Sequence, residues 1–128
     1  MNIALWALQG LLALHTVIGA AWKLSHSEAS VPSLSALPHP VWMSLGAIEV
    51  LAAVALLLPV LGSRFAKAPL VGAAFLTCEM TLFTLVHLAS GTSDHGEIVY
   101  WLGVAALSTL LAFGRRSLSP HTPVPATP

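Results

Sequence analysis

The chain has 128 residues, of which 56% are hydrophobic and only 8% are charged. A soluble domain carries roughly 25% charged residues, so this composition excludes that class and indicates a membrane protein. The formal net charge is zero, which argues against a nucleic-acid partner. The chain has a single cysteine, Cys78, which excludes an intrachain disulfide, a CxxC pair and a zinc finger. Cys78 lies in an apolar run, where we expect a buried thiol. Any redox chemistry therefore needs a bound cofactor or a partner protein.

Four apolar runs follow one another along the chain, at approximately 3–22, 41–61, 69–88 and 98–113. A helix needs about 20 apolar residues to cross a bilayer, within a range of roughly 17–25. The first three runs meet this requirement, and the fourth does so if its helix begins near Glu97. Backbone groups in lipid must be satisfied within the segment, and no alternating pattern is present. We therefore predict an all-α fold, a bundle of four transmembrane helices.

The bundle is predicted to form one domain over residues 1–116. The first run has no Lys or Arg before it and is too long for the apolar region of a signal peptide, so we expect it to be retained as a helix. Residues 117–128 are rich in Pro, Thr and Ser and predict a disordered tail.

Basic residues give the expected orientation. One side of the bundle holds both termini and the second connection, and it carries four of the five Lys and Arg residues: Arg64, Lys67, Arg115 and Arg116. The opposite side carries one, Lys23. The positive-inside rule then predicts an N-in/C-in topology, with the first and third connections outside. Four aromatic residues are expected at the outer interface: Trp22, Trp42, Tyr100 and Trp101.

This topology brings ionisable residues to similar depths. The outer half of the bundle is predicted to hold one candidate ligand-binding polar cluster: His15, Lys23, Glu49, Glu79 and His87. At about 100° per residue, each of the first three helices presents its members of this cluster on one face, with Gly19 and Gly46 allowing close approach. Glu97 lies at the outer mouth. The inner half is nearly free of ionisable groups.

The energetic cost of placing these ionisable side chains in the membrane favours a functional role for them. An ionised side chain at the bilayer centre costs about 2.5–3.5 kcal/mol on insertion scales, so intramembrane charges are functional candidates. A structural role stays open for each: Glu49 can pair with Lys23 or hydrogen-bond His15, and Lys23 can extend to the outer headgroups. The negative charge of Glu97 can stabilise the positive N-terminal end of its helix.

Two histidines and two glutamates form a ligand set that would suit iron, manganese or zinc. No Glu-x-x-His occurs on a single helix, in contrast to di-iron bundles, so a metal is the less favoured occupant. No nucleophile elbow, phosphate loop or HExxH is present. The residues assign neither a catalytic residue nor an enzyme class.

Three segments in order carry a resemblance: "LQGLLALHTVIGAAWKLS", "PHPVWMSLGAIEVLAAVALLLP" and "APLVGAAFLTCEMTLFTLVHLASG". The matching features are G-x-x-x-K ending at Lys23, G-x-x-E ending at Glu49, the LLLP that closes the second helix, and His87 near the end of the third. Over residues 5–115 the chain resembles the DoxX-like family of small four-helix membrane proteins. His15 and Glu79 fall outside this pattern.

The resemblance implies a multi-pass protein of the bacterial inner membrane, in contact with lipid. Relatives in the family include a subunit of a thiosulfate:quinone oxidoreductase and a component of a membrane oxidoreductase complex. Others assist assembly, namely an acetylcholine-receptor chaperone and a protein needed for methylamine dehydrogenase maturation. The family therefore indicates a setting and not a reaction.

Two main hypotheses follow. In the first, the chain is a redox-associated subunit that works with a membrane oxidoreductase and binds a quinone-like ring. His15 or His87 would donate to a ring carbonyl, Glu49 or Glu79 would relay protons, and three residues would pack the ring: Met80, Phe83 and Trp101. In the second, the chain is a non-catalytic assembly protein whose polar face maintains the fold. A transporter is the weaker third, since four helices usually oligomerise to form a pathway, and the oligomeric state stays open.

Overall fold

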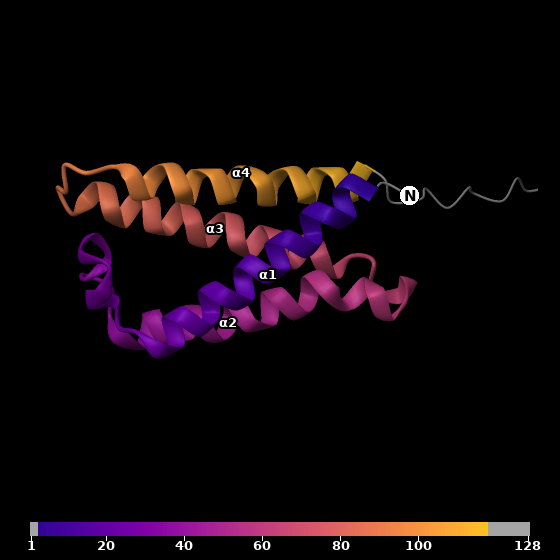
Figure 1. The fold of residues 1–128 in the computed structure, drawn as a ribbon, viewed down its shortest axis with the longest axis horizontal. Helices are drawn as coiled ribbons and strands as arrows, with labels where there is room; N and C mark the ends of the chain where they lie inside the picture. The colour runs from indigo at the N-terminus through magenta and orange to yellow at the C-terminus, as the bar shows by residue number, and fades with distance from the viewer. Residues whose placement is uncertain (1–2, 118–128) are drawn as a thin grey trace, which may run out of the picture.

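The computed structural model describes residues 3–117, and the chain folds there into four long helices joined by three connections (Figure 1). The helices are α1 (Ile3–Ser25), α2 (His39–Leu57), α3 (Ala68–Ala89) and α4 (Gly96–Ser117). Between α1 and α2 lie two short 3-10 helices, η1 (Glu28–Ser30) and η2 (Pro32–Leu34), and between α2 and α3 lie η3 (Leu58–Leu61) and η4 (Ser63–Phe65). No strand occurs in this part of the chain.

The predicted all-α bundle is confirmed, because all four helices are long and apolar enough to cross a membrane. The fourth helix begins at Gly96, two residues before the apolar run, and its 22 residues remove the apparent shortness of that run. The orientation in the membrane stays a prediction. So does the disordered tail: Ser117 is the last residue of α4, and residues 118–128 lie outside the described part.

Prolines set several helix boundaries. Pro40 occupies the first turn of α2 and Pro69 the first turn of α3, where the missing N–H has no intrahelical partner to lose. Pro59 falls just after α2, and the chain continues there as a 3-10 turn. Gly62 then adopts a φ of 151°, a conformation that glycine tolerates, and the chain reverses direction.

The four helices pack as two hairpins (Figure 1). α1 lies along α2, α3 lies along α4, and α2 joins the hairpins by packing on α3. α1 and α4 share the smallest interface of the neighbouring pairs, and Figure 1 shows α1 running obliquely away from α4 toward one end of the bundle. Two ends result. We call the end with residues 26–38 and 90–95 the acidic end, and the end with residues 58–67, Ile3 and Ser117 the basic end.

Each helix buries one face and exposes an apolar one. The core includes Leu56, Ala73, Leu76 and Leu111, each at most 1% exposed. Large apolar side chains such as Leu51 and Val71 are more than 60% exposed on the outside. An apolar exterior of this kind suits contact with the lipid bilayer.

The first connection folds back over the acidic end. Leu34 of η2 is 1% exposed, and η2 packs against α3. This connection therefore closes part of the bundle end and does not extend into solvent.

Candidate functional site

A buried group of three charged side chains connects α1, α2 and α3. Lys23 Nζ donates a hydrogen bond to Glu49 Oε1 over 2.8 Å and lies 3.7 Å from Glu79 Oε1. We call these residues the lysine–glutamate triad. Their exposures are 7% for Lys23 and 2% for each glutamate, so the charges are removed from solvent. When all three are ionised the triad carries a net charge of −1, which one bound proton would cancel.

The triad leaves acceptor atoms without donors. Glu49 Oε2 and both carboxylate oxygens of Glu79 are buried and have no hydrogen-bond partner within residues 3–117. A buried acceptor without a donor costs free energy, about 1–3 kcal/mol for a neutral group and more for a charged one. Native structures rarely keep such atoms without a reason, and a proton or a ligand would satisfy them.

Two glycines allow the helices of the triad to approach closely. A Cβ at Gly46 of α2 would lie 3.1 Å from Leu24 Cδ2 and 3.4 Å from Lys23 Cβ. A Cβ at Gly19 of α1 would lie 3.8 Å from a carboxylate oxygen of Glu49. Gly46 thus brings α2 against the turn that carries Lys23, and the Glu49 carboxylate rests on the backbone of α1. The structure confirms that these small residues lie at the helix contact.

An aromatic layer lies directly above the triad, toward the acidic end. Phe83 is its centre, with ring centroids 6.5 Å from Trp42 and 5.7 Å from Trp101. Lys23 Nζ lies 5.1 Å from the centroid of Phe83 and 5.9 Å from that of Trp42, which are cation–π distances. The indole N–H of Trp42 donates to the backbone oxygens of Lys23 and His26, and so satisfies carbonyls at the end of α1.

A second polar group, the rim, lies beyond the aromatic layer. His87 is 1% exposed, and its Nδ1 lies 3.5 Å from Glu97 Oε2. The same oxygen of Glu97 accepts a hydrogen bond from Ser33 Oγ over 3.0 Å. The ring of His87 also stands edge-on to Trp101, at 5.6 Å between centroids. The rim thereby links the first connection, α3 and α4.

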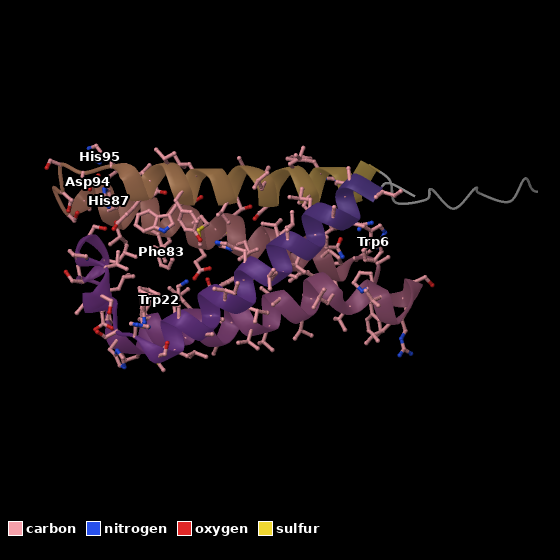
Figure 2. All side chains as sticks on the ribbon, viewed as in Figure 1. Trp6, Trp22, Phe83, His87, Asp94 and His95 are labelled. Carbon is pink, nitrogen blue, oxygen red and sulfur yellow. The ribbon has the colours of Figure 1, made fainter. Side chains whose placement is uncertain are left out.

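A pocket of about 410 Å³ opens between the aromatic layer and the rim. Its walls come from all four helices and the first connection, with Trp22, Trp42, Phe83, Tyr100 and Trp101 as aromatic lining. Figure 2 shows Trp22 of α1 and Phe83 of α3 on opposite sides of this space. Two charged side chains also reach the pocket: Lys23 from the triad and Glu97 from the rim. The pocket can therefore accept a flat ring and offer it one donor and one acceptor.

The structure divides the five predicted site residues into three places. Lys23, Glu49 and Glu79 come together as the triad. His87 lies one aromatic layer away, because Phe83 occupies the helical turn between Glu79 and His87. Binding of a ligand by these residues stays a prediction.

His15 forms neither a hydrogen bond nor an ion pair with the triad or with His87 within the described residues. Its Nε2 forms a hydrogen bond with the hydroxyl of Tyr100, which joins α1 to α4. This bond crosses between the two helices that share the smallest interface. The five residues therefore do not form one hydrogen-bonded group within the described residues: three meet in the triad, Phe83 and Trp101 lie between the triad and His87, and His15 bonds to Tyr100.

Sequence reasoning also missed several features. Trp42 and Trp101 were expected at the outer interface, but they are 1% and 6% exposed and line the pocket; Trp101 had also been proposed as a ring contact, whereas Trp42 had not. Glu97 was expected at the outer mouth and at its helix terminus; it borders the pocket, and the hydrogen bond that it accepts from Ser33 was not expected. Met80 was expected to pack a ring, but it is a buried core residue outside the pocket lining. No local spacing indicated the contact of Ser33 with Glu97, because it joins residues 64 positions apart.

The expectation for Cys78 is wrong. The thiol is exposed on the outer face of α3, beside the inward-facing Glu79. Adjacent helical residues point about 100° apart, so burying Glu79 turns Cys78 outward. Within residues 3–117, no group of three or more His, Cys, Asp or Glu side chains is close enough together to hold a metal ion.

Comparison with known proteins gives one match. The model of the DoxX-like family matches residues 7–113, a range that contains the triad, the aromatic layer and the rim. No curated protein and no solved structure matches the chain.

Proposed function

This chain belongs to the DoxX-like family, and we propose that it is a redox-associated membrane subunit that binds a quinone-like ring in the pocket at the acidic end. One observation carries the proposal. The pocket has aromatic walls, an ammonium at its base and a carboxylate at its rim, and buried carboxylates without donors lie behind the ammonium. A polar ring with two opposed oxygens fits this combination of shape and chemistry.

Lys23 is the residue proposed to hold a ring oxygen. An ammonium has three donors, and one of them is used by Glu49. Phe83 and Trp42 flank the same ammonium and would stack on or against the ring. Glu97 lines the opposite side and would accept a hydrogen bond from a ring hydroxyl. These roles replace the donors expected from the sequence, because neither His15 nor His87 lines the pocket.

The two glutamates are proposed to exchange the two protons that accompany the two electrons of the quinone–quinol couple, one proton at each carboxylate. Their free oxygens lie behind Lys23, out of the pocket lining, so a proton would pass between the pocket and Glu49 or Glu79 by way of the ammonium. Bound quinone would supply the electron-carrying chemistry. The electrons would come from a partner oxidoreductase, since the chain has one cysteine and no metal-binding group in its described part.

The proposed setting is the bacterial inner membrane with both termini in the cytoplasm. Of the five Lys and Arg residues in the chain, four lie at the basic end, and this distribution supports the proposed orientation. The pocket then faces outward. α1 and α4 supply seven of its eleven lining residues and share the smallest helix interface, so a ring from the bilayer would enter most easily between them.

An assembly role is the alternative, and one feature favours it. The Lys23–Glu49 pair and the Trp42 indole both join α1 to α2, which is what a purely structural cluster would do. The two functions differ in what the carboxylates are for. Structural carboxylates are needed for stability and a partner interaction, whereas site carboxylates are needed for ligand retention.

Mass spectrometry of the protein in native lipid discs tests the proposal. We expect a stoichiometric quinone with the wild type and with Glu28→Gln, a control glutamate of the first connection outside the pocket lining. Glu49→Gln and Glu79→Gln should lose the quinone while remaining folded. Equal retention in all four proteins, or a folded wild type with no extractable ligand, would contradict the proposal. Loss of thermal stability together with a co-purifying protein would support the assembly role.

A further inference from the structure

The basic end holds a second pocket, of about 590 Å³, between the start of α3 and the end of α4. Two cations line it: Lys67, directly before α3, and Arg116, in the last turn of α4. The remaining lining is apolar, from Leu70, Ala112 and Phe113. Figure 1 shows that these helix termini lie at the same end of the bundle, remote from the first connection.

The two cations that line this pocket have no ionic partner within the described residues. Both Lys67 and Arg116 are exposed. The sequence has no Asp or Glu in residues 50–78 or 98–128. The side-chain charge of the basic end is therefore positive throughout.

From this we infer that the basic-end pocket is a binding site for the phosphate headgroup of an anionic phospholipid, whose acyl chain lies against Phe113 and Leu70. Arg116 would bind the phosphate through two N–H groups, and Lys67 would act as a point charge. Phe113 is 64% exposed and borders the cations, so it offers the apolar contact that a free phosphate would not need. Basic pockets between transmembrane helices on the cytoplasmic side are known binders of such headgroups.

Two other cations of this end serve different purposes and do not line the pocket. Arg115 Nε donates to Gln9 Oε1 over 2.8 Å and its guanidinium lies 4.5 Å from the ring centroid of Trp6, so it fixes α4 to α1. Arg64 stacks on its neighbour Phe65, at 4.7 Å. The C-terminal residues 118–128 contain no acidic side chain, so charge complementarity favours a lipid over this segment as the occupant.

Native mass spectrometry tests the inference with full-length protein and a mixture of phosphatidylglycerol and phosphatidylcholine of identical acyl chains. Wild type should retain phosphatidylglycerol preferentially. The ratio of bound phosphatidylglycerol to bound phosphatidylcholine should fall about fivefold for each cation removed. Lys67→Gln and Arg116→Gln each remove one cation, and the double variant removes both. Arg64→Gln, the matched control, should keep the wild-type ratio. Circular dichroism should show that every variant remains helical.

Three results would overturn the inference. The first is an unchanged lipid ratio in the double variant. The second is an equal loss in Arg64→Gln, which would assign the preference to the general charge of the basic end. The third is displacement of the lipid by millimolar inorganic phosphate, which would identify a site for free phosphate.

Discussion

The two ends of the bundle use charge in opposite ways. Toward the acidic end the three side chains of the triad point inward, are at most 7% exposed and contact one another, as Lys23 and Glu49 show. At the basic end Lys67 and Arg116 point outward and have no ionic partner in the described structure. Figure 2 shows the labelled Trp22 and Phe83 toward the acidic end and Trp6 toward the basic end.

The difference separates two physical roles for charge in a membrane protein. An exposed cation near a helix end interacts with water and lipid headgroups at little cost, and it contributes to orientation. A buried ionic group carries a desolvation penalty that only partners can offset. The acidic end keeps such a group and leaves carboxylate oxygens without donors, which is why we place the functional site there.

Replacing the same residue type at each end gives the largest expected contrast. Lys23→Met leaves two buried carboxylates without their cation and should lower the free energy of unfolding by about 3–5 kcal/mol. Lys67→Met removes an exposed, unpaired cation and should change it by less than about 0.5 kcal/mol. Unfolding in a zwitterionic detergent measures both. Similar losses in the two variants would mean that burial does not distinguish the two ends.

The two glutamates of the triad should differ in the same assay. Glu49→Gln removes the 2.8 Å ion pair and leaves Lys23 with Glu79 at 3.7 Å, so a loss of about 1–3 kcal/mol is expected. Glu79→Gln keeps the shorter pair and removes the excess negative charge, so the loss should be below about 1 kcal/mol. The reverse order would show that Glu79, and not Glu49, is the main partner of Lys23.

Alanine substitutions at two glycines, one toward each end of the bundle, test how strongly each end depends on close packing. Gly46→Ala places a methyl group 3.1 Å from Leu24 and 3.4 Å from Lys23, whereas Gly114→Ala places one 2.7 Å from the side chain of Leu5. Each should cost roughly 1 kcal/mol, because flexible side chains can move aside. Only Gly46→Ala should lower quinone retention, since only it displaces Lys23. Retention that falls equally in both would indicate a general loss of packing.

The smallest effect concerns the first connection. Glu28 Oε2 accepts a hydrogen bond from His39 Nδ1 over 2.8 Å, and this bond holds the pKa of Glu28 below its usual range. A lowered folded-state pKa stabilises the fold above the unfolded value of about 4.3, and the contribution disappears as the pH falls through the folded pKa. Hydrogen exchange in residues 27–39 should therefore accelerate below about pH 4. Glu28→Gln should abolish this pH step, and a step that persists would assign it to another group.

Much of the fold follows from the sequence because lipid imposes simple rules. The apolar runs predicted the four helices, and the spacing of Lys23, Glu49 and Glu79 predicted that they meet. Where polar residues recur at helical intervals on an apolar chain, burial and pairing leave few alternatives.

The layered arrangement of the site could not be read from the sequence. Trp42 and Trp101 were assigned to the membrane interface because rings beside a connection usually lie there, yet the hydrogen bonds from Trp42 to the end of α1 hold its ring inside. The fold of residues 26–38 over the bundle depends on long-range contacts of Leu34 and Ser33, which carry no local periodicity. These long-range contacts place aromatic side chains between His87 and the triad.

Tryptophan fluorescence tests the central claim most directly, because Trp22, Trp42 and Trp101 border the pocket and Trp6 does not. The measurement is a titration of Trp6→Phe in lipid discs with a short-chain quinone, with Trp6→Phe/Glu79→Gln as the control. The account predicts saturable quenching with one quinone per chain in Trp6→Phe and weak, linear quenching in the control. Linear quenching of equal slope in both proteins would contradict it and would leave the buried charges of the acidic end with a structural role.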